Sequence, residues 1–259
     1  MLMVISPAKT LDYESDINTP PPTQPDFLKQ SQALVDVLKG YKPPQMAKLM
    51  KLSDKLADLN VGRYQEWKRP FTEKNARPAL MAFKGDVYTG LAAEEFNKND
   101  LKFAQKHLRL LSGLYGLLRP LDLMQPYRLE MGTKLKNPKG KDLYEFWGDT
   151  PVTAINEQLK SLKSKELVNL ASNEYFKAVD TKLFEGEIIT PVFKDFKSGR
   201  YKVISFFAKK ARGMMVRYAI DNRITKAEDL KGFDVAGYAF NPEMSSAKEW
   251  VFTRDEAED

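Results

Sequence analysis

The sequence predicts a single compact domain in which helices and strands are mixed along the chain. Its 259 residues fit one large domain, and hydrophobic residues make up 42% of them, enough for a substantial core. Short apolar runs alternate with segments of helical periodicity, and no linker or internal repeat divides the chain. We therefore treat residues 1–259 as one unit.

The first third of the chain predicts a strand followed by three helices. The run around Val4 and Ile5 is apolar but brief, and it lacks the basic start and long apolar stretch of a signal peptide. It is expected to be a buried strand. A proline-rich connector then covers residues 19–25. Helices are predicted over residues 26–38, from Pro43 through Met50, and from Ser53 through Leu59.

The middle of the chain is less regular. Residues 79–83 form a short apolar run that predicts a strand entering a polar turn, and residues 92–111 predict a helix with an interruption. Glycine, proline and apolar residues are mixed over 111–132, which is typical of a compact, well-packed loop. Two helices, over 142–147 and 152–162, follow.

The last third predicts a strand, a hairpin and two helices. Residues 167–171 are expected to form the strand, which ends in a polar turn. Ser198-Gly199 joins the two strands of the hairpin, and a capping box marks the last helix start. The hairpin strands lie within 187–196 and 201–207, and the helices over 208–220 and from Thr225 to Leu230.

Composition excludes several kinds of site. The chain has no cysteine and one histidine, so disulfides, thiolate chemistry and a histidine-rich metal site are ruled out. No metal site or cofactor is predicted, and acid–base chemistry would need carboxylates, lysine or tyrosine. His107 is expected to be a helix-surface or partly packed residue. No run approaches the length of a membrane helix.

The positive charge is concentrated in one stretch of chain. The net charge is +6, and the segment from Lys194 to Arg223 holds nine basic and two acidic residues. That segment carries +7, so the rest of the chain sums to about −1. Clustered cations attract polyanions, and the segment predicts nucleic-acid binding.

Within that stretch, Lys209, Lys210 and Arg212 are expected near one side of a helix, with Arg217 about a turn onward. A helix start disfavours cations, and a bound phosphate would relieve this cost. The alternative is a solvated basic face.

Gly113-Leu114-Tyr115-Gly116 follows a predicted helix and resembles the turn of a helix-hairpin-helix module, whose backbone N–H groups contact phosphate. The common pattern is one residue shorter, and Pro120 would interrupt the second helix. The alternative is a packing turn.

Polar turns beyond the apolar strands predict a second site. Their convergence would form a mixed-charge pocket in which Asp86 or Glu174 could act as acid or base. The pocket candidates are Lys9, Lys84, Asp86, Arg119, Arg128, Glu174 and Lys177. No phosphate-binding glycine loop, serine-nucleophile motif or zinc-protease motif is present.

Long strings of the sequence resemble the YaaA family of bacterial peroxide-stress proteins. The strings lie at 5–13, 82–91, 111–132, 140–144, 169–172 and 208–213. The resemblance implies an α+β fold peculiar to the family, with a positively charged cleft and a helix-hairpin-helix element. It also implies double-stranded DNA as the partner, a cytoplasmic location, and protection against peroxide by lowering free intracellular iron.

Three functions follow, in the order in which we rank them. The first is a non-enzymatic DNA-binding protein of the peroxide-stress response, without sequence specificity. Its candidate contacts are Lys209, Lys210, Arg212, Arg217, Gly113, Gly116, Arg119 and Arg128. The alternative is an enzyme that acts on a nucleotide or phosphorylated small molecule in the mixed-charge pocket. A protein–protein adaptor, suggested by the acidic tail 255–259, ranks last.

Overall fold

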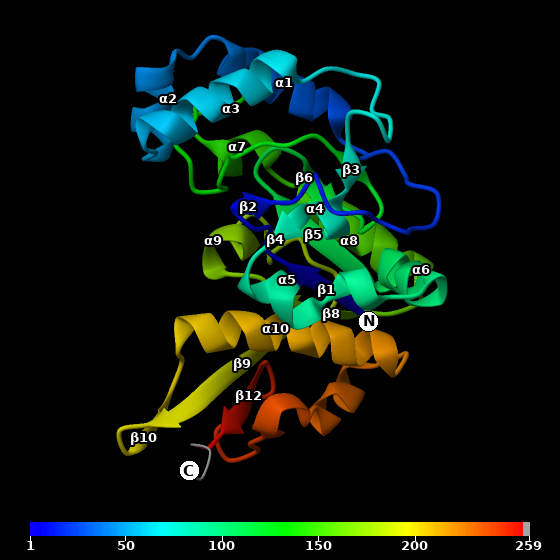
Figure 1. Ribbon diagram of the computed structural model, residues 1–259. Helices are drawn as coiled ribbons and strands as arrows, with labels where there is room; N and C mark the ends of the chain where they lie inside the picture. Colours follow the sequence, from blue (N-terminus) through cyan, green and yellow to red (C-terminus); the bar gives the residue numbers. More distant parts are fainter. Residues whose placement is uncertain (256–259) are drawn as a thin grey trace.

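A computed structural model describes residues 1–255, and its centre is a mixed β-sheet (Figure 1). The sheet runs in the order β11-β12-β9-β8-β1-β5-β6, with β10 added beside β9. Strands β12, β9, β8, β1 and β5 run parallel to one another, whereas β11 and β6 at the two ends of the path are antiparallel to their neighbours. The bounds are β1 Leu2–Ile5, β5 Leu108–Ser112, β6 Gly116–Leu118, β8 Glu166–Leu170, β9 Glu187–Lys197, β10 Arg200–Lys202, β11 Ala239–Phe240 and β12 Glu249–Arg254.

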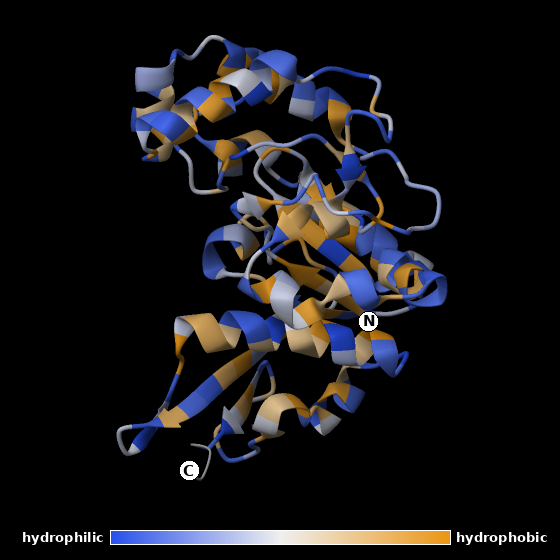
Figure 2. Cartoon of the chain, in the orientation of Figure 1, coloured by the Kyte–Doolittle hydropathy of each residue, from blue (hydrophilic) through white to orange (hydrophobic). Residues whose placement is uncertain are grey.

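Strand β1 lies inside the sheet, between β8 and β5, and both of its faces are covered. All four of its residues are buried and apolar, as expected for a strand flanked by parallel neighbours. Val4 lies beside Arg109 of β5 on one side and Asn169 of β8 on the other. Figure 2 shows this part of the sheet as the most hydrophobic region of the fold.

Helices cover the sheet and form a separate layer above it (Figure 1). The upper layer contains α1 Leu28–Lys39, α2 Pro43–Met50 and α3 Asp54–Glu66. The other helices are α4 Ala79–Ala82, α5 Asp86–Leu91, α6 Lys98–His107, α7 Leu143–Trp147, α8 Thr150–Ser161, α9 Asn173–Phe176 and α10 Ser205–Asp221, with 3-10 turns η1 Ala93–Glu95, η2 Ala227–Gly232 and η3 Val235–Gly237. Two small ladders join β2 Thr10–Leu11 to β4 Phe83–Lys84 and β3 Arg77–Pro78 to β7 Leu123–Met124.

The structure is a single compact α/β domain, which confirms the mixed single-domain prediction but replaces α+β with α/β. The reason is that helices alternate with parallel strands in the middle of the sheet, where α+β folds segregate them. None of the helices in the described part of the chain is long and apolar enough to cross a membrane.

Most predicted elements are confirmed. Strands β1 and β8, the three N-terminal helices, α7, α8 and the first hairpin strand β9 lie where the pattern places them. The hairpin forms, but its second strand, expected within 201–207, is only Arg200–Lys202, because α10 begins at Ser205. Gly40 ends α1, and Asp142 caps α7 by accepting a hydrogen bond from the N–H of Glu145. His107 is a packed residue: its ring stacks on Phe103, and Nδ1 lies 2.9 Å from the carbonyl oxygen of Met1.

Three further predictions are wrong. Residues 79–82 are helical, and only Phe83 and Lys84 form a strand. The helix expected over 92–111 ends at His107, because Leu108–Ser112 pairs with β1 and an apolar run of this length suits either structure. The capping box at Thr225 does not form; the N–H of Ala227 instead donates to Glu166. Of the acidic tail, residues 256–259 lie outside the described residues.

Candidate functional site

The carboxyl ends of β1 and β8 lie side by side at the point where the order of the parallel strands reverses. Ile5 pairs with Leu170, and the chain leaves β1 toward β5 but leaves β8 toward β9 on the opposite side. Crevices for ligands form at such a switch point in parallel sheets. The next residues meet there: the N–H of Ser172 donates to Oγ of Ser6 at 2.8 Å.

The polar turns of the predicted pocket converge beside this point. Thr10 pairs with Lys84 in the ladder between β2 and β4. Nζ of Lys84 lies 2.6 Å from Oδ2 of Asp12, and Nζ of Lys9 lies 3.0 Å from Oε2 of Glu130. Two ion pairs thus hold residues that are far apart in sequence.

The pKa of Asp12 is held well below its usual range by this arrangement. The ammonium group of Lys84 contributes most, followed by the hydroxyl of Ser15 and the backbone N–H groups of Ser15 and Glu14. Asp12 is therefore a permanent carboxylate that orders its own loop and holds Lys84. It is not suited to act as a general acid.

Glu174 and Lys177 join the same region from α9. Oε1 of Glu174 accepts a hydrogen bond from the N–H of Gly132 at 2.9 Å, and Lys177 lies over the ring of Tyr144 at 5.0 Å. Arg128 contacts Glu130 in the loop that also holds Gly132, with NH2 3.4 Å from Oε1. The structure therefore brings the predicted pocket residues Lys9, Lys84, Arg128, Glu174 and Lys177 to the loops beyond β1 and β8.

Helix α10 reaches this region through Lys209, whose Nζ lies 4.0 Å from Oδ2 of Asp86. Arg212 is half-buried, and burial lowers its pKa; neither Arg212 nor Lys210 has an ion-pair partner among residues 1–255. The predicted basic helix face is thus only partly open, since Lys209 is exposed while Arg212 is mostly covered.

Arg217 is occupied within the protein. It lies 2.9 Å from Glu95 and 3.3 Å from Asp221, and its guanidinium group stacks on the ring of Phe96. It also donates to the carbonyl oxygen of Ala92. These contacts fasten α10 to the segment after α5, so the expectation that Arg217 extends an open basic face does not fit its surroundings.

Comparison with known proteins gives the family. A profile described as "Peroxide stress protein YaaA" matches residues 1–244. A UPF0246 protein of Hahella chejuensis is 57% identical over 255 residues, covering 98% of this chain and 100% of that protein. A UPF0246 protein of Idiomarina loihiensis is 60% identical over 256 residues, 99% of each chain. The chain belongs to the YaaA peroxide stress protein family.

The helix-hairpin-helix element expected of a YaaA protein does not lie at Gly113–Gly116. These residues form the turn between the antiparallel strands β5 and β6. A Cβ atom on Gly113 would lie 2.2 Å from the carbonyl oxygen of Leu129, and Gly116 has a positive φ of 71° against the ring of Trp147. The prediction is wrong because Leu108–Leu111 is a strand, and both glycines are buried packing residues.

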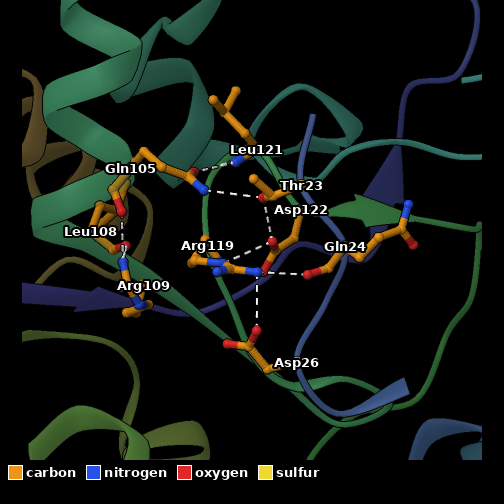
Figure 3. A network of polar contacts seen from close by, with 9 residues as sticks. All are labelled: Thr23, Gln24, Asp26, Gln105, Leu108, Arg109, Arg119, Leu121 and Asp122. Carbon is orange, nitrogen blue, oxygen red and sulfur yellow. Dashed lines mark hydrogen bonds and ion pairs between the residues drawn. The ribbon is translucent and has the colours of Figure 1, made fainter. Parts of the chain in front are cut away.

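Arg119 belongs to a structural network instead of the pocket (Figure 3). Its guanidinium group contacts Asp122 at 2.9 Å and Asp26 at 3.1 Å, and it donates to the carbonyl oxygen of Gln24. Burial raises the pKa of Asp122, and Arg119 opposes that shift. The network fastens the proline-rich connector of this YaaA protein to the segment after β6.

Two groups of residues are not among the predicted site residues. The first is the set of cations on the β9–β10 hairpin, which the alternating pattern and the Ser198-Gly199 turn indicate. The second is Arg63 and Arg77, which line a cavity with Tyr13. No local pattern marks these three residues, because α3, β3 and the loop after β2 meet only in the folded chain.

Proposed function

We propose that this protein binds double-stranded DNA, without reading its sequence, as its part in the peroxide-stress response. The observation that carries the proposal is a group of cations without acidic partners on the β9–β10 hairpin. We call this group the basic arm; it consists of Lys194, Lys197, Arg200 and Lys202. None of them has a carboxylate partner among residues 1–255.

The arm extends away from the body of the molecule at the lower left of Figure 1. Ser198 and Gly199 form its turn with positive φ values of 56° and 79°, as in the tight turns that match strand twist. Asp195, the acidic residue of β9 nearest the turn, is buried and engaged by Arg254 and the hydroxyl of Tyr238. Asp195 therefore joins the arm to the body of the protein through Arg254 and Tyr238, and it does not form an ion pair with the cations of the arm.

Like charges face each other across the hairpin. Arg200 pairs directly with Lys197, and Lys202 shares their face because it pairs with Asp195, two residues before Lys197. Like charges directly opposite one another destabilise a strand pair. A row of phosphates along a duplex would relieve this repulsion, with release of counterions as the driving force.

The surface continues into the first turns of α10. Lys209 and Lys210 follow the arm in sequence, and among the described residues the one ion pair of Lys209 is a long contact with Asp86. Val203 and Phe206 are 53% and 55% exposed at the junction. Apolar side chains beside cations suit nucleic acid, where they pack on sugars and bases.

The lowering of free iron belongs to the proposal as an indirect effect. Within residues 1–255, no group of three or more His, Asp or Glu side chains is arranged to hold a metal ion. We therefore attribute the protection against peroxide to DNA binding, with iron affected through other components. Equilibrium dialysis against ferrous iron would contradict this if the purified protein retained stoichiometric metal.

The test is the salt dependence of binding to a duplex oligonucleotide. Substitution of Lys197, Arg200 and Lys202 by Gln removes three phosphate contacts, and each contact contributes about 0.9 to the slope of log K against log salt. The slope should fall by about 2.7. When the salt concentration rises fourfold, the factor by which affinity drops should therefore be roughly 40 times smaller for the variant than for the parent. Fluorescence anisotropy at several salt concentrations measures both slopes.

A matched control removes the same charge elsewhere. Lys102, Lys106 and Lys165 are exposed, have no ion-pair partner among the described residues, and lie on α6 and before β8. Their triple Gln variant should keep the parent slope. Equal losses in the two variants would indicate attraction by net charge alone and would refute the basic arm as the binding surface.

A second candidate is an enzyme acting on a nucleotide or phosphorylated small molecule. The convergence of Lys9, Lys84 and Glu174 beyond β1 and β8 favours it, because ligands bind at such switch points. Phosphate release from a panel of nucleotides tests it. Turnover that Glu174→Gln abolishes would establish it, and no turnover by the parent would reject it.

A further inference from the structure

A cavity of about 900 Å³ lies between α3, β3 and the loop after β2. Tyr13, Arg63, Arg77 and Gln125 line it, and its size is in the range of pockets that hold small metabolites. The charged loops beyond β1 and β8 are a neighbouring feature, and Arg63 also lines a smaller hollow beside Lys84. No function proposed above uses the larger cavity.

Arg77 is the unusual residue of this cavity. It is 8% exposed, and its Nε atom is buried without a hydrogen-bond partner among residues 1–255. It has no carboxylate partner in that range either, while its backbone is fixed by the pairing with Met124. A buried polar atom without a hydrogen-bond partner is costly, so the Nε atom of Arg77 calls for a partner such as a bound water or ligand.

Arg63 faces the same cavity with little compensation. Within residues 1–255 its side chain makes one hydrogen bond, to Oδ1 of Asn60 at 3.3 Å. Burial lowers its pKa; Tyr13 and Tyr64 oppose this shift, and the charge of Arg128 adds a smaller lowering. Nε of Arg128 is also buried without a partner. Two guanidinium groups, those of Arg63 and Arg77, thus line one cavity, and Arg128 lies close enough to Arg63 to affect its charge.

Tyr13 does not supply the missing negative charge. Its hydroxyl donates to the carbonyl oxygen of Met124 at 2.7 Å, and burial raises its pKa, so the phenol stays neutral. Acidic residues do line the cavity, but none lies within ion-pair distance of Arg63 or Arg77 in the described chain. They are Glu14, Asp16, Glu66 and Glu73. Cations and carboxylates are therefore present in one cavity but are not paired with each other.

This separation defines the chemistry of a ligand. Arg63 and Arg77 need an oxyanion, for which guanidinium groups have matching geometry. The carboxylates are exposed around the cavity and can accept hydrogen bonds from hydroxyl or amino groups of such a ligand. We propose that the cavity binds a small metabolite that carries a phosphate or carboxylate group together with hydroxyl or amino groups, with Arg63 and Arg77 as its anion-binding residues.

The proposal is independent of DNA binding by the basic arm, because the arm lies at the other end of the molecule from α3 (Figure 1). A small phosphorylated metabolite and DNA both carry phosphate groups, so either could contact Arg63 and Arg77. The test therefore uses pyrophosphate, ribose 5-phosphate and citrate as small probes, and a duplex oligonucleotide as the competing source. Titration calorimetry and thermal unfolding of the full chain report binding.

At least one small probe should bind with a Kd below roughly 1 mM, and Arg63→Gln should weaken it tenfold or more. Arg63 is only half-buried, so this variant is expected to fold. Arg77→Lys, which keeps the charge but loses the planar fork, should weaken the same probe. Arg200→Gln, on the basic arm, should leave probe binding unchanged.

Two outcomes would overturn the inference. One is that none of the small probes binds the parent protein at roughly 10 mM, or that binding survives both arginine substitutions. The other is that Arg63→Gln weakens the duplex but no small probe, which would assign the guanidinium groups to DNA phosphates. Loss of probe binding with unchanged duplex binding would establish a small-molecule site.

Discussion

Helices α5 and α10 approach each other so closely that glycine is required on both. A Cβ atom on Gly213 would lie 1.8 Å from the carbonyl oxygen of Val87, and one on Gly90 would lie 2.0 Å from that of Lys210. Both clashes are with backbone, which cannot rotate away as a side chain can. Gly213→Ala therefore requires the two helices to separate.

The cost follows from the distance. A comfortable carbon–oxygen contact is about 3.3 Å, so the helices must move apart by about 1.5 Å along this direction. Forcing extra atoms into a packed interface costs about 3 kcal/mol at the upper end, while the gain in helix propensity is about 1 kcal/mol. We expect a net loss of about 2 kcal/mol or more in the free energy of unfolding, or roughly 4–8 °C in Tm for a chain of this size.

Gly62 provides the control for this substitution. It lies inside α3, and a Cβ atom there would meet nothing within 4 Å. Gly62→Ala should therefore raise the free energy of unfolding by about 0.5–1 kcal/mol through helix propensity alone. Urea unfolding followed by circular dichroism measures both variants. If Gly213→Ala were as stable as Gly62→Ala, close packing of α5 on α10 would not be the reason for glycine at 213.

Two further predictions follow from the ion pairs. The folded-state pKa of Asp12 is lowered, so its contribution to stability is present above its unfolded value near pH 4 and is lost as pH falls below it. Asp12→Asn should therefore reduce the acid-induced loss of Tm seen in the parent between about pH 5 and pH 2, and an unchanged profile would contradict the assignment. Arg217→Gln removes contacts with Glu95 and Phe96 and should cost about 1–2 kcal/mol in urea unfolding. Its duplex affinity should stay within about twofold of the parent, because the side chain is already occupied; a tenfold loss would place Arg217 on the DNA surface.

Elements with a strong local signal could be predicted from the sequence. The apolar run of β1 and the helical spacing of α1 to α3 encode their own secondary structure, because burial on one or both faces fixes the pattern. The run Leu108–Leu111 could not be assigned in this way. It is a strand because β1 lies beside it, and that error led to the wrong placement of a helical hairpin at Gly113–Gly116.

The sequence by itself determined the family, the excess of cations between Lys194 and Arg223, and the absence of cysteine chemistry, since these depend only on which residues are present. The tertiary structure alone decided which of those cations are available. Arg217 is neutralised by Glu95, more than a hundred residues earlier in the chain, whereas Lys197 and Arg200 face each other with no carboxylate partner among the described residues. A charge acts on its neighbours in space at distances of a few ångströms, and those neighbours are set by how α5, α10 and β9 pack together.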